Sequence, residues 1–89
     1  MLEVRATTRF KKEVKKAARQ QKEMQRLGAA IDLLQAEELL PERNLDHALT
    51  GNYMGHRECH LSADWLLIYK IEGSTLILVR TGSHSELFR

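Results

Sequence analysis

The sequence predicts an α+β fold in which a helical hairpin packs on one face of an antiparallel sheet. Apolar residues recur at steps of three and four from residue 10 to residue 34, which is the period of amphipathic helices. From residue 56 onward, apolar and alternating segments are separated by turn residues, which is typical of strands. Helices and strands in separate parts of one chain favour the α+β class, here in the order β-α-α-β-β-β.

The first half of the chain is predicted to form one strand and two helices. Residues 2–5 alternate apolar and charged side chains, and Thr7 or Thr8 can cap the helix that follows. The polar block 20–23 is the expected turn, because a single long helix would leave its ends unpacked in so small a domain. The second helix is expected to reach about Glu38, before the only proline of the chain.

The second half is predicted to form three strands joined by turns. The strands are expected at residues 56–61, 65–71 and 75–81, after a loop at 44–55 and before a loop or short helical turn at 82–89. The middle strand is so apolar that both of its faces are expected to be covered. Alternation places Glu58 and His60 on the face opposite Cys59, and Arg80 on the face of the leucines in the last strand.

The composition limits which class of protein this chain can be. A chain of 89 residues with 43% hydrophobic and 29% charged residues fits one globular domain over residues 1–89. No apolar run approaches the roughly 18 residues of a membrane span, and no signal peptide is expected at the N-terminus. The single cysteine, Cys59, excludes an internal disulfide and fits the reducing cytoplasm, where we expect the protein.

Charge is distributed unevenly along the chain. Residues 1–26 carry nine Lys or Arg against three Asp or Glu, whereas residues 27–89 carry five against nine. A basic helical stretch is a plausible footprint for a nucleic acid or an acidic partner protein. The alternative is a helix face that is merely solvated.

Three histidines stand in separate segments, each with polar neighbours: His47 after an aspartate, His60 near Glu58 and Asp64, and His84 between two serines. Histidine exchanges protons near neutral pH, and residues from strand ends and loops commonly converge at one edge of a sheet. We therefore expect a site assembled by folding. No metal is expected in it, because Cys59 and His60 point to opposite faces and no CxxC spacing occurs.

Such a cluster, completed by the guanidinium of Arg80, suits metal-independent RNA cleavage. A base removes the proton of the 2′-hydroxyl, an acid protonates the departing 5′-oxygen, and a cation stabilises the phosphorane. Arginine is the natural cation because its fork of N–H groups matches phosphate oxygens. Trp65, Tyr53 and Phe88 are candidates for stacking an RNA base.

Four stretches occur in an order that resembles the YafQ branch of the RelE-type toxins of bacterial toxin–antitoxin systems. They are residues 46–53 (DHALTGNY), 55–60 (GHRECH), 64–70 (DWLLIYK) and 80–88 (RTGSHSELF). The resemblance covers residues 45–88 nearly continuously, and residues 1–44 only in element order and basic character. His56 stands where this branch more often has an aromatic residue, so we leave it out of the site.

The resemblance implies a RelE-like fold and a ribosome-dependent endoribonuclease that cuts mRNA in the decoding site. The catalytic positions implied are His47, His60, Asp64 and His84. His84 is expected as the acid and Asp64 or His60 as the base, with His47 orienting or sharing that work. Substrate contacts are expected from Arg80, Phe88, Trp65 and Glu58, although Trp65 can equally be a packing residue and Glu58 can tune His60 or be solvated.

The resemblance also implies partners and no cofactor. The partners are the ribosome with its mRNA and a cognate antitoxin, with promoter DNA bound only by the toxin–antitoxin complex. Contacts with the ribosome or RNA are expected from Lys11, Lys12, Lys15 and Lys16. The alternative is a non-catalytic module that binds an acidic partner protein or a nucleic acid, with its histidines incidental.

Overall fold

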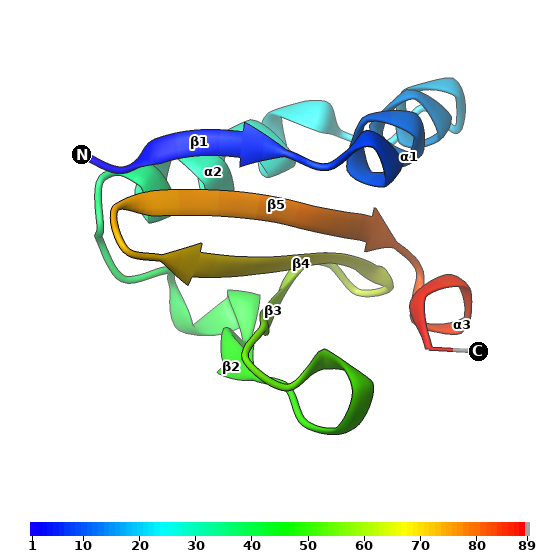
Figure 1. Cartoon of the computed structure of the whole chain (residues 1–89). Coiled ribbons are helices and arrows are strands. Elements are labelled where there is room, and N and C mark those ends of the chain that lie inside the picture. The colour runs from blue at the N-terminus through cyan, green and yellow to red at the C-terminus, as the bar shows by residue number, and fades with distance from the viewer. Residues whose placement is uncertain (89) are drawn as a thin grey trace.

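Five strands form one sheet, with helices packed against it (Figure 1). The computed structural model describes residues 1–88, so Arg89, at the end of the predicted C-terminal segment, lies outside the described residues. The strands are β1 (Glu3–Ala6), β2 (His47–Ala48), β3 (Arg57–Ser62), β4 (Trp65–Glu72) and β5 (Thr75–Gly82). The helices are α1 (Thr8–Arg19), α2 (Met24–Gln35) and the short α3 (His84–Leu87). The predicted α+β class is confirmed.

The order of strands in the sheet is β1-β5-β4-β3-β2, and one edge of it is parallel. β1 runs parallel to β5, with Glu3 opposite Thr75 and Ala6 opposite Leu78. Parallel neighbours need a long connection between them, and α1 and α2 lie in that connection. The predicted antiparallel arrangement holds for β2 to β5, and the whole sheet is mixed.

Thr7 is the residue that caps α1. Its Oγ1 accepts a hydrogen bond from the Phe10 amide at 2.9 Å and donates one to the Val79 carbonyl at 2.8 Å. The same side chain therefore starts the helix and ties it to β5. The turn after α1 falls in the predicted block, with Gln21 in the left-handed conformation at a φ of 61°.

α2 ends at Gln35, three residues before the predicted end. Glu37 adopts a φ of 60°, and the amide of Glu38 donates to the carbonyl of Leu33, which is the Schellman arrangement of a helix C-terminus. Helical periodicity continues past Gln35 in the sequence, so the sequence pattern does not reveal that α2 ends there. No helix within residues 1–88 is long and apolar enough to cross a membrane.

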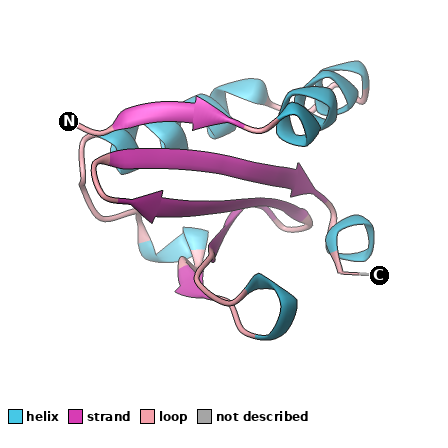
Figure 2. Cartoon of the chain, viewed as in Figure 1, coloured by secondary structure: helices cyan, strands magenta, loops and turns pink. Residues whose placement is uncertain are grey.

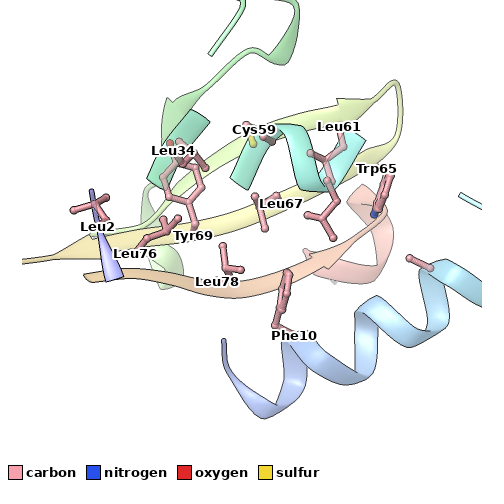
Figure 3. Close-up of a cluster of buried hydrophobic side chains, with 13 residues drawn as sticks. Leu2, Phe10, Leu34, Cys59, Leu61, Trp65, Leu67, Tyr69, Leu76 and Leu78 are labelled. Carbon is pink, nitrogen blue, oxygen red and sulfur yellow. The ribbon is translucent and has the colours of Figure 1, made fainter. Parts of the chain in front are cut away.

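Hydrophobic clusters lie on both faces of the sheet. The larger one is covered by α1 and α2, and Figure 3 shows Phe10, Leu34, Cys59, Trp65, Leu67, Tyr69 and Leu78 among its members. The smaller one, on the opposite face, consists of Leu66, Ile68 and Leu87, with Leu49, Tyr53 and Val79 packed against it. Residues 65–69 of β4 are at most 1% exposed, which confirms that this strand is covered on both faces.

A β-bulge in β5 changes the face on which Arg80 lies. Tyr69 pairs with Leu78, but the preceding residue of β4, Ile68, pairs with Arg80, so Val79 is an extra residue. Directly paired residues share a face, and Arg80 therefore lies with Ile68 and not with the leucines of β5. The prediction from strict alternation was wrong for Arg80, because one inserted residue reverses the alternation beyond it.

The segment predicted as a loop, residues 44–55, contains short ordered pieces (Figure 2). β2 pairs with β3 and places His47 opposite Glu58. Turns of 3₁₀ helix at Glu42–Asn44 and Gly51–Tyr53 flank it. A strand of two residues is too short for hydrophobic periodicity to reveal, so it was missed.

Candidate active site

The carboxylate of Glu58 lies between two histidines on the sheet face opposite α1 and α2. Its Oε1 is 3.5 Å from Nε2 of His47 and 3.6 Å from Nε2 of His60. The Glu58 side chain is 3% exposed, and its Oε2 has no hydrogen-bond partner among residues 1–88. One carboxylate oxygen therefore lies within 4 Å of both imidazoles. Within the same residues, no group of three His, Cys, Asp or Glu side chains is arranged to hold a metal ion.

His47 keeps a fixed orientation although half of its side chain is exposed. Its Nδ1 is 2.6 Å from the carbonyl oxygen of Leu45, and since a carbonyl only accepts, Nδ1 carries a hydrogen. Nε2 is thus the nitrogen that faces the carboxylate. The preceding residue, Asp46, accepts hydrogen bonds from the Tyr69 hydroxyl at 2.6 Å and from Arg57 Nε at 3.3 Å. These bonds tie the loop to the sheet.

His84 begins α3 at the end of β5. The Oγ of Ser83 accepts from the Glu86 amide at 3.2 Å, and the Glu86 carboxylate accepts from the Ser83 amide at 2.8 Å, which forms a capping box. The backbone amide of His84 donates to Oδ1 of Asp64 at 3.0 Å. Glu86 also pairs with Lys16 of α1, and Lys16 and the Ser83 amide lower the pKa of the Glu86 carboxyl to about 2. The capping box, the bond to Asp64 and the ion pair with α1 therefore fix the start of this short helix.

The guanidinium of Arg80 is bound on two sides. Nη2 donates to Glu13 Oε2 at 2.6 Å, and Nε lies 3.2 Å from the same oxygen. Nη1 donates to the Tyr53 hydroxyl at 3.3 Å. The bond to Glu13 raises the pKa of Arg80 and outweighs the opposite effect of burial. A guanidinium has five N–H groups, and these contacts leave one on each Nη to donate to phosphate oxygens.

Phe88 packs against two other rings beside Arg80. The ring centroids of Phe88 and His84 are 4.9 Å apart, and those of Phe88 and Tyr53 are 5.8 Å apart in an edge-to-face arrangement. Phe88 is still 37% exposed. An exposed aromatic ring next to His84 is suited to stacking an RNA base.

Strand register sets the polar groups in two rows across the sheet. The first row, from β2 to β5, is His47, Glu58, Ile68 and Arg80. The second row, from β3 to β5, is His60, Leu66 and Gly82, and His84 follows two residues later. Neighbouring strands are about 4.8 Å apart, so roughly 10 Å separates His60 from the segment that carries His84. The apolar side chains of Leu66 and Ile68 on β4 lie between the two sides and form an apolar floor.

Some predicted residues lie outside this arrangement. Trp65 is 1% exposed and belongs to the helix-covered core, and its indole N–H has no partner among residues 1–88. Asp64 contacts the His84 backbone, so it lies at the His84 end of the site. Lys11, Lys12 and Lys15 are exposed on α1, whereas Lys16 is engaged with Glu86. His56, which we left out of the site, packs edge-on against Tyr53.

Sequence reasoning missed one residue of the site, Glu13, and named Tyr53 only for base stacking. Both bind the Arg80 guanidinium. A weak signal for Glu13 exists in hindsight, because it is the only carboxylate in a strongly basic stretch of the first helix. Nothing in the sequence pairs either residue with Arg80, which lies 67 positions from Glu13 and 27 from Tyr53.

Comparison with known proteins adds independent information. The family described as "Bacterial toxin of type II toxin-antitoxin system, YafQ" matches this chain over residues 2–89. The mRNA interferase toxin YafQ of Escherichia coli strain K12 is 40% identical over 80 residues, which is 89% of this chain and 87% of that protein.

Solved structures share the whole fold. A copper-bound mutant toxin from Helicobacter pylori superposes with a TM-score of 0.95 at 38% identity, over 99% of this chain and all of that chain. YafQ from E. coli strain BL21(DE3) gives 0.94 at 34% identity, and YafQ in its complex with DinJ gives 0.92 at 34%, both over the full length of both chains. The E. coli names agree with the endoribonuclease that the sequence predicts. The chain belongs to the YafQ family of bacterial toxins of type II toxin–antitoxin systems.

Proposed function

We propose that this protein is a ribosome-dependent mRNA interferase that cuts messenger RNA in the decoding site through attack of the 2′-hydroxyl on the neighbouring phosphate. The observation that carries this proposal is the pair of rows across the sheet. They place two imidazoles and a carboxylate on one side of an apolar floor, and Arg80 and His84 on the other. The attacking and leaving oxygens take opposite sides of the phosphorus, so a base and an acid on opposite sides of the phosphate suit this reaction.

The roles of four residues follow from their surroundings. His60 takes the proton of the 2′-hydroxyl, and the Glu58 carboxylate, 3.6 Å from its Nε2, stabilises the imidazolium that forms. His84 gives a proton to the departing 5′-oxygen. Arg80 donates its two remaining N–H groups to the phosphorane. One proton is taken and one is given, and the products are a 2′,3′-cyclic phosphate and a 5′-hydroxyl.

The other predicted residues support these steps. His47 shares the Glu58 carboxylate and orients it toward His60. Asp64 holds the amide of His84, which leaves the role of base to His60. Phe88 stacks a base of the RNA beside the scissile phosphate.

Primer extension on an mRNA translated in vitro tests the proposal. We expect discrete, in-frame cuts when the protein and ribosomes are both present, and none on the same RNA without ribosomes. Cuts only on free RNA would mean a free ribonuclease. No cuts under either condition would favour the non-catalytic binding module.

The exposed lysines of α1 are proposed to contact ribosomal RNA. Changing Lys11, Lys12 and Lys15 to glutamine is expected to weaken cleavage and to flatten its salt dependence, because each lost phosphate contact removes roughly 0.7 to 0.9 from the slope of log binding constant against log salt. Lys70→Gln, on β4 beside Glu72, is the matched control. Wild-type activity and slope in the triple variant would exclude this surface from ribosome binding. Unchanged cleavage with lost antitoxin binding would assign it to the antitoxin.

A cognate antitoxin is the proposed protein partner, as DinJ is the partner of E. coli YafQ in their complex. We expect its inhibitory segment to be acidic or amphipathic and to cover the sheet face of His60 or the basic helices. Promoter DNA would be bound only by the toxin–antitoxin complex. A structure of the co-purified complex tests this, and an antitoxin that touches neither surface would contradict it.

A further inference from the structure

A carboxylate on α1 contacts the proposed catalytic segment at two successive residues. Oε2 of Glu13 accepts from Nη2 of Arg80 at 2.6 Å, and Oε1 accepts from the backbone amide of Thr81 at 3.2 Å. Both residues follow the β-bulge, on the part of β5 that leads to His84. The side chains of Glu13 and Arg80 are 18% and 9% exposed, so this ion pair is largely shielded from water.

We propose that Glu13 is a positioning residue for RNA cleavage, because it holds Arg80 with its two remaining N–H groups directed at the scissile phosphate. The inference rests on the function proposed above. Glu13 does not touch the RNA in this account. It acts through Arg80, and through Thr81 it also fixes the backbone from which Arg80 extends.

The geometry explains why such a residue is needed. An arginine side chain has several rotatable bonds, so ordering it costs conformational entropy. Glu13 binds the edge formed by Nε and Nη2, and the Tyr53 hydroxyl binds Nη1 from the other side. The guanidinium is therefore ordered before substrate arrives, which is the condition under which a fixed cation stabilises a transition state best.

Substrate can reach the pair from solvent. A pocket of about 360 Å³ opens beside it between α1 and the end of β5, and Arg9 and Lys22 also line this pocket. The local surface is thus basic apart from Glu13 and Glu86. A phosphate that approaches is attracted by the cations and repelled by Glu13, so Glu13 is expected to cost affinity while it improves geometry.

Because Glu13 is expected to lower affinity for the substrate but to improve the geometry of Arg80, Glu13→Gln should change the two kinetic parameters differently. Glutamine keeps the shape and can still accept from the Thr81 amide, but it loses the charge that holds Arg80. We expect the maximum cleavage rate to fall about tenfold or more, as for other small misplacements of a catalytic group. The toxin concentration for half-maximal rate is expected to stay the same or to fall.

The test is single-turnover cleavage of ribosome-bound mRNA by the wild type, Glu13→Gln, Arg80→Ala and the double variant. Positioning through Arg80 requires that Glu13→Gln lowers the maximum rate when Arg80 is present and has no further effect when it is absent. Glu72→Gln is the matched control, since Glu72 pairs with Lys70 at 3.2 Å and is the last residue of β4. The end of β4 lies far from α3 (Figure 1). Circular dichroism shows whether each variant is folded.

Two outcomes would overturn the inference. A Glu13→Gln variant with the wild-type maximum rate would show that Arg80 needs no such support. An equal loss of maximum cleavage rate with Arg80 present and with Arg80→Ala would show that Glu13 acts on the fold and not through Arg80. If Glu13→Gln does not fold, the same cycle with Glu13→Asp, which shortens the side chain by one methylene, decides by the same criteria. Absence of cleavage by the wild type would instead contradict the proposed function itself.

Discussion

Replacing His84 with alanine is expected to abolish mRNA cleavage while the domain stays folded. Loss of a general acid lowers the rate by about 10²–10⁴-fold. The His84 side chain is exposed and its ring contacts Phe88, whereas the bond to Asp64 is made by the backbone amide and remains in the variant. The stability change is therefore expected to stay within about 0.5 kcal/mol. Primer extension on translated mRNA and thermal unfolding measure the two effects.

A control from the same helix separates the loss of the imidazole from damage to α3. Ser85→Ala changes the next residue, which is also exposed, and is expected to leave cleavage unchanged. A His84→Ala variant that is expressed, folded and as active as the wild type would remove our assignment of the acid. A variant that is inactive because it is unfolded would show that the imidazole stabilises the domain.

Replacing Trp65 with alanine is expected to destabilise the domain by about 3–5 kcal/mol, the usual cost of removing a buried aromatic side chain. Trp65 is 1% exposed and belongs to the core between the sheet and the helices (Figure 3). Total stabilities of such domains are about 5–15 kcal/mol, so the variant is expected to be partly unfolded at growth temperature. Equilibrium unfolding in urea measures the change.

Trp65→Phe separates packing from a direct role in binding RNA. The indole N–H has no partner among residues 1–88, so phenylalanine keeps most of the apolar contact without leaving a polar group unpaired. We expect this variant to be modestly less stable and to cut mRNA at close to the wild-type rate. A stable Trp65→Phe variant with strongly reduced cleavage would show that the indole acts on the substrate.

The secondary structure could be predicted from the sequence where local patterns are strong. The helical hairpin, the turn at residues 20–23 and the three long strands all follow from hydrophobic period and turn residues, and the structure confirms them. The end of α2 and the strand β2 could not be predicted. A left-handed residue such as Glu37 and a two-residue pairing leave little trace in the period of apolar residues.

Alternation along the strands predicted one side of the candidate site correctly and the other side wrongly. Alternation along β3 put Glu58 and His60 on one face, and the structure shows them there with His47. Alternation failed for Arg80, because the bulge at Val79 inserts one residue into β5. A bulge depends on how two strands pair, and the sequence of one strand does not reveal it.

The sequence by itself determined the fold class, the family and the set of candidate residues, because period and spaced motifs are local properties of a chain. Only the tertiary structure decided what those residues touch. It placed Glu58 between two histidines, buried Trp65 in the core, and joined Arg80 to Glu13, 67 positions earlier in the chain. Such contacts depend on strand register and on the packing of α1 against β5, which bring distant segments together and are not encoded in the spacing of either segment alone.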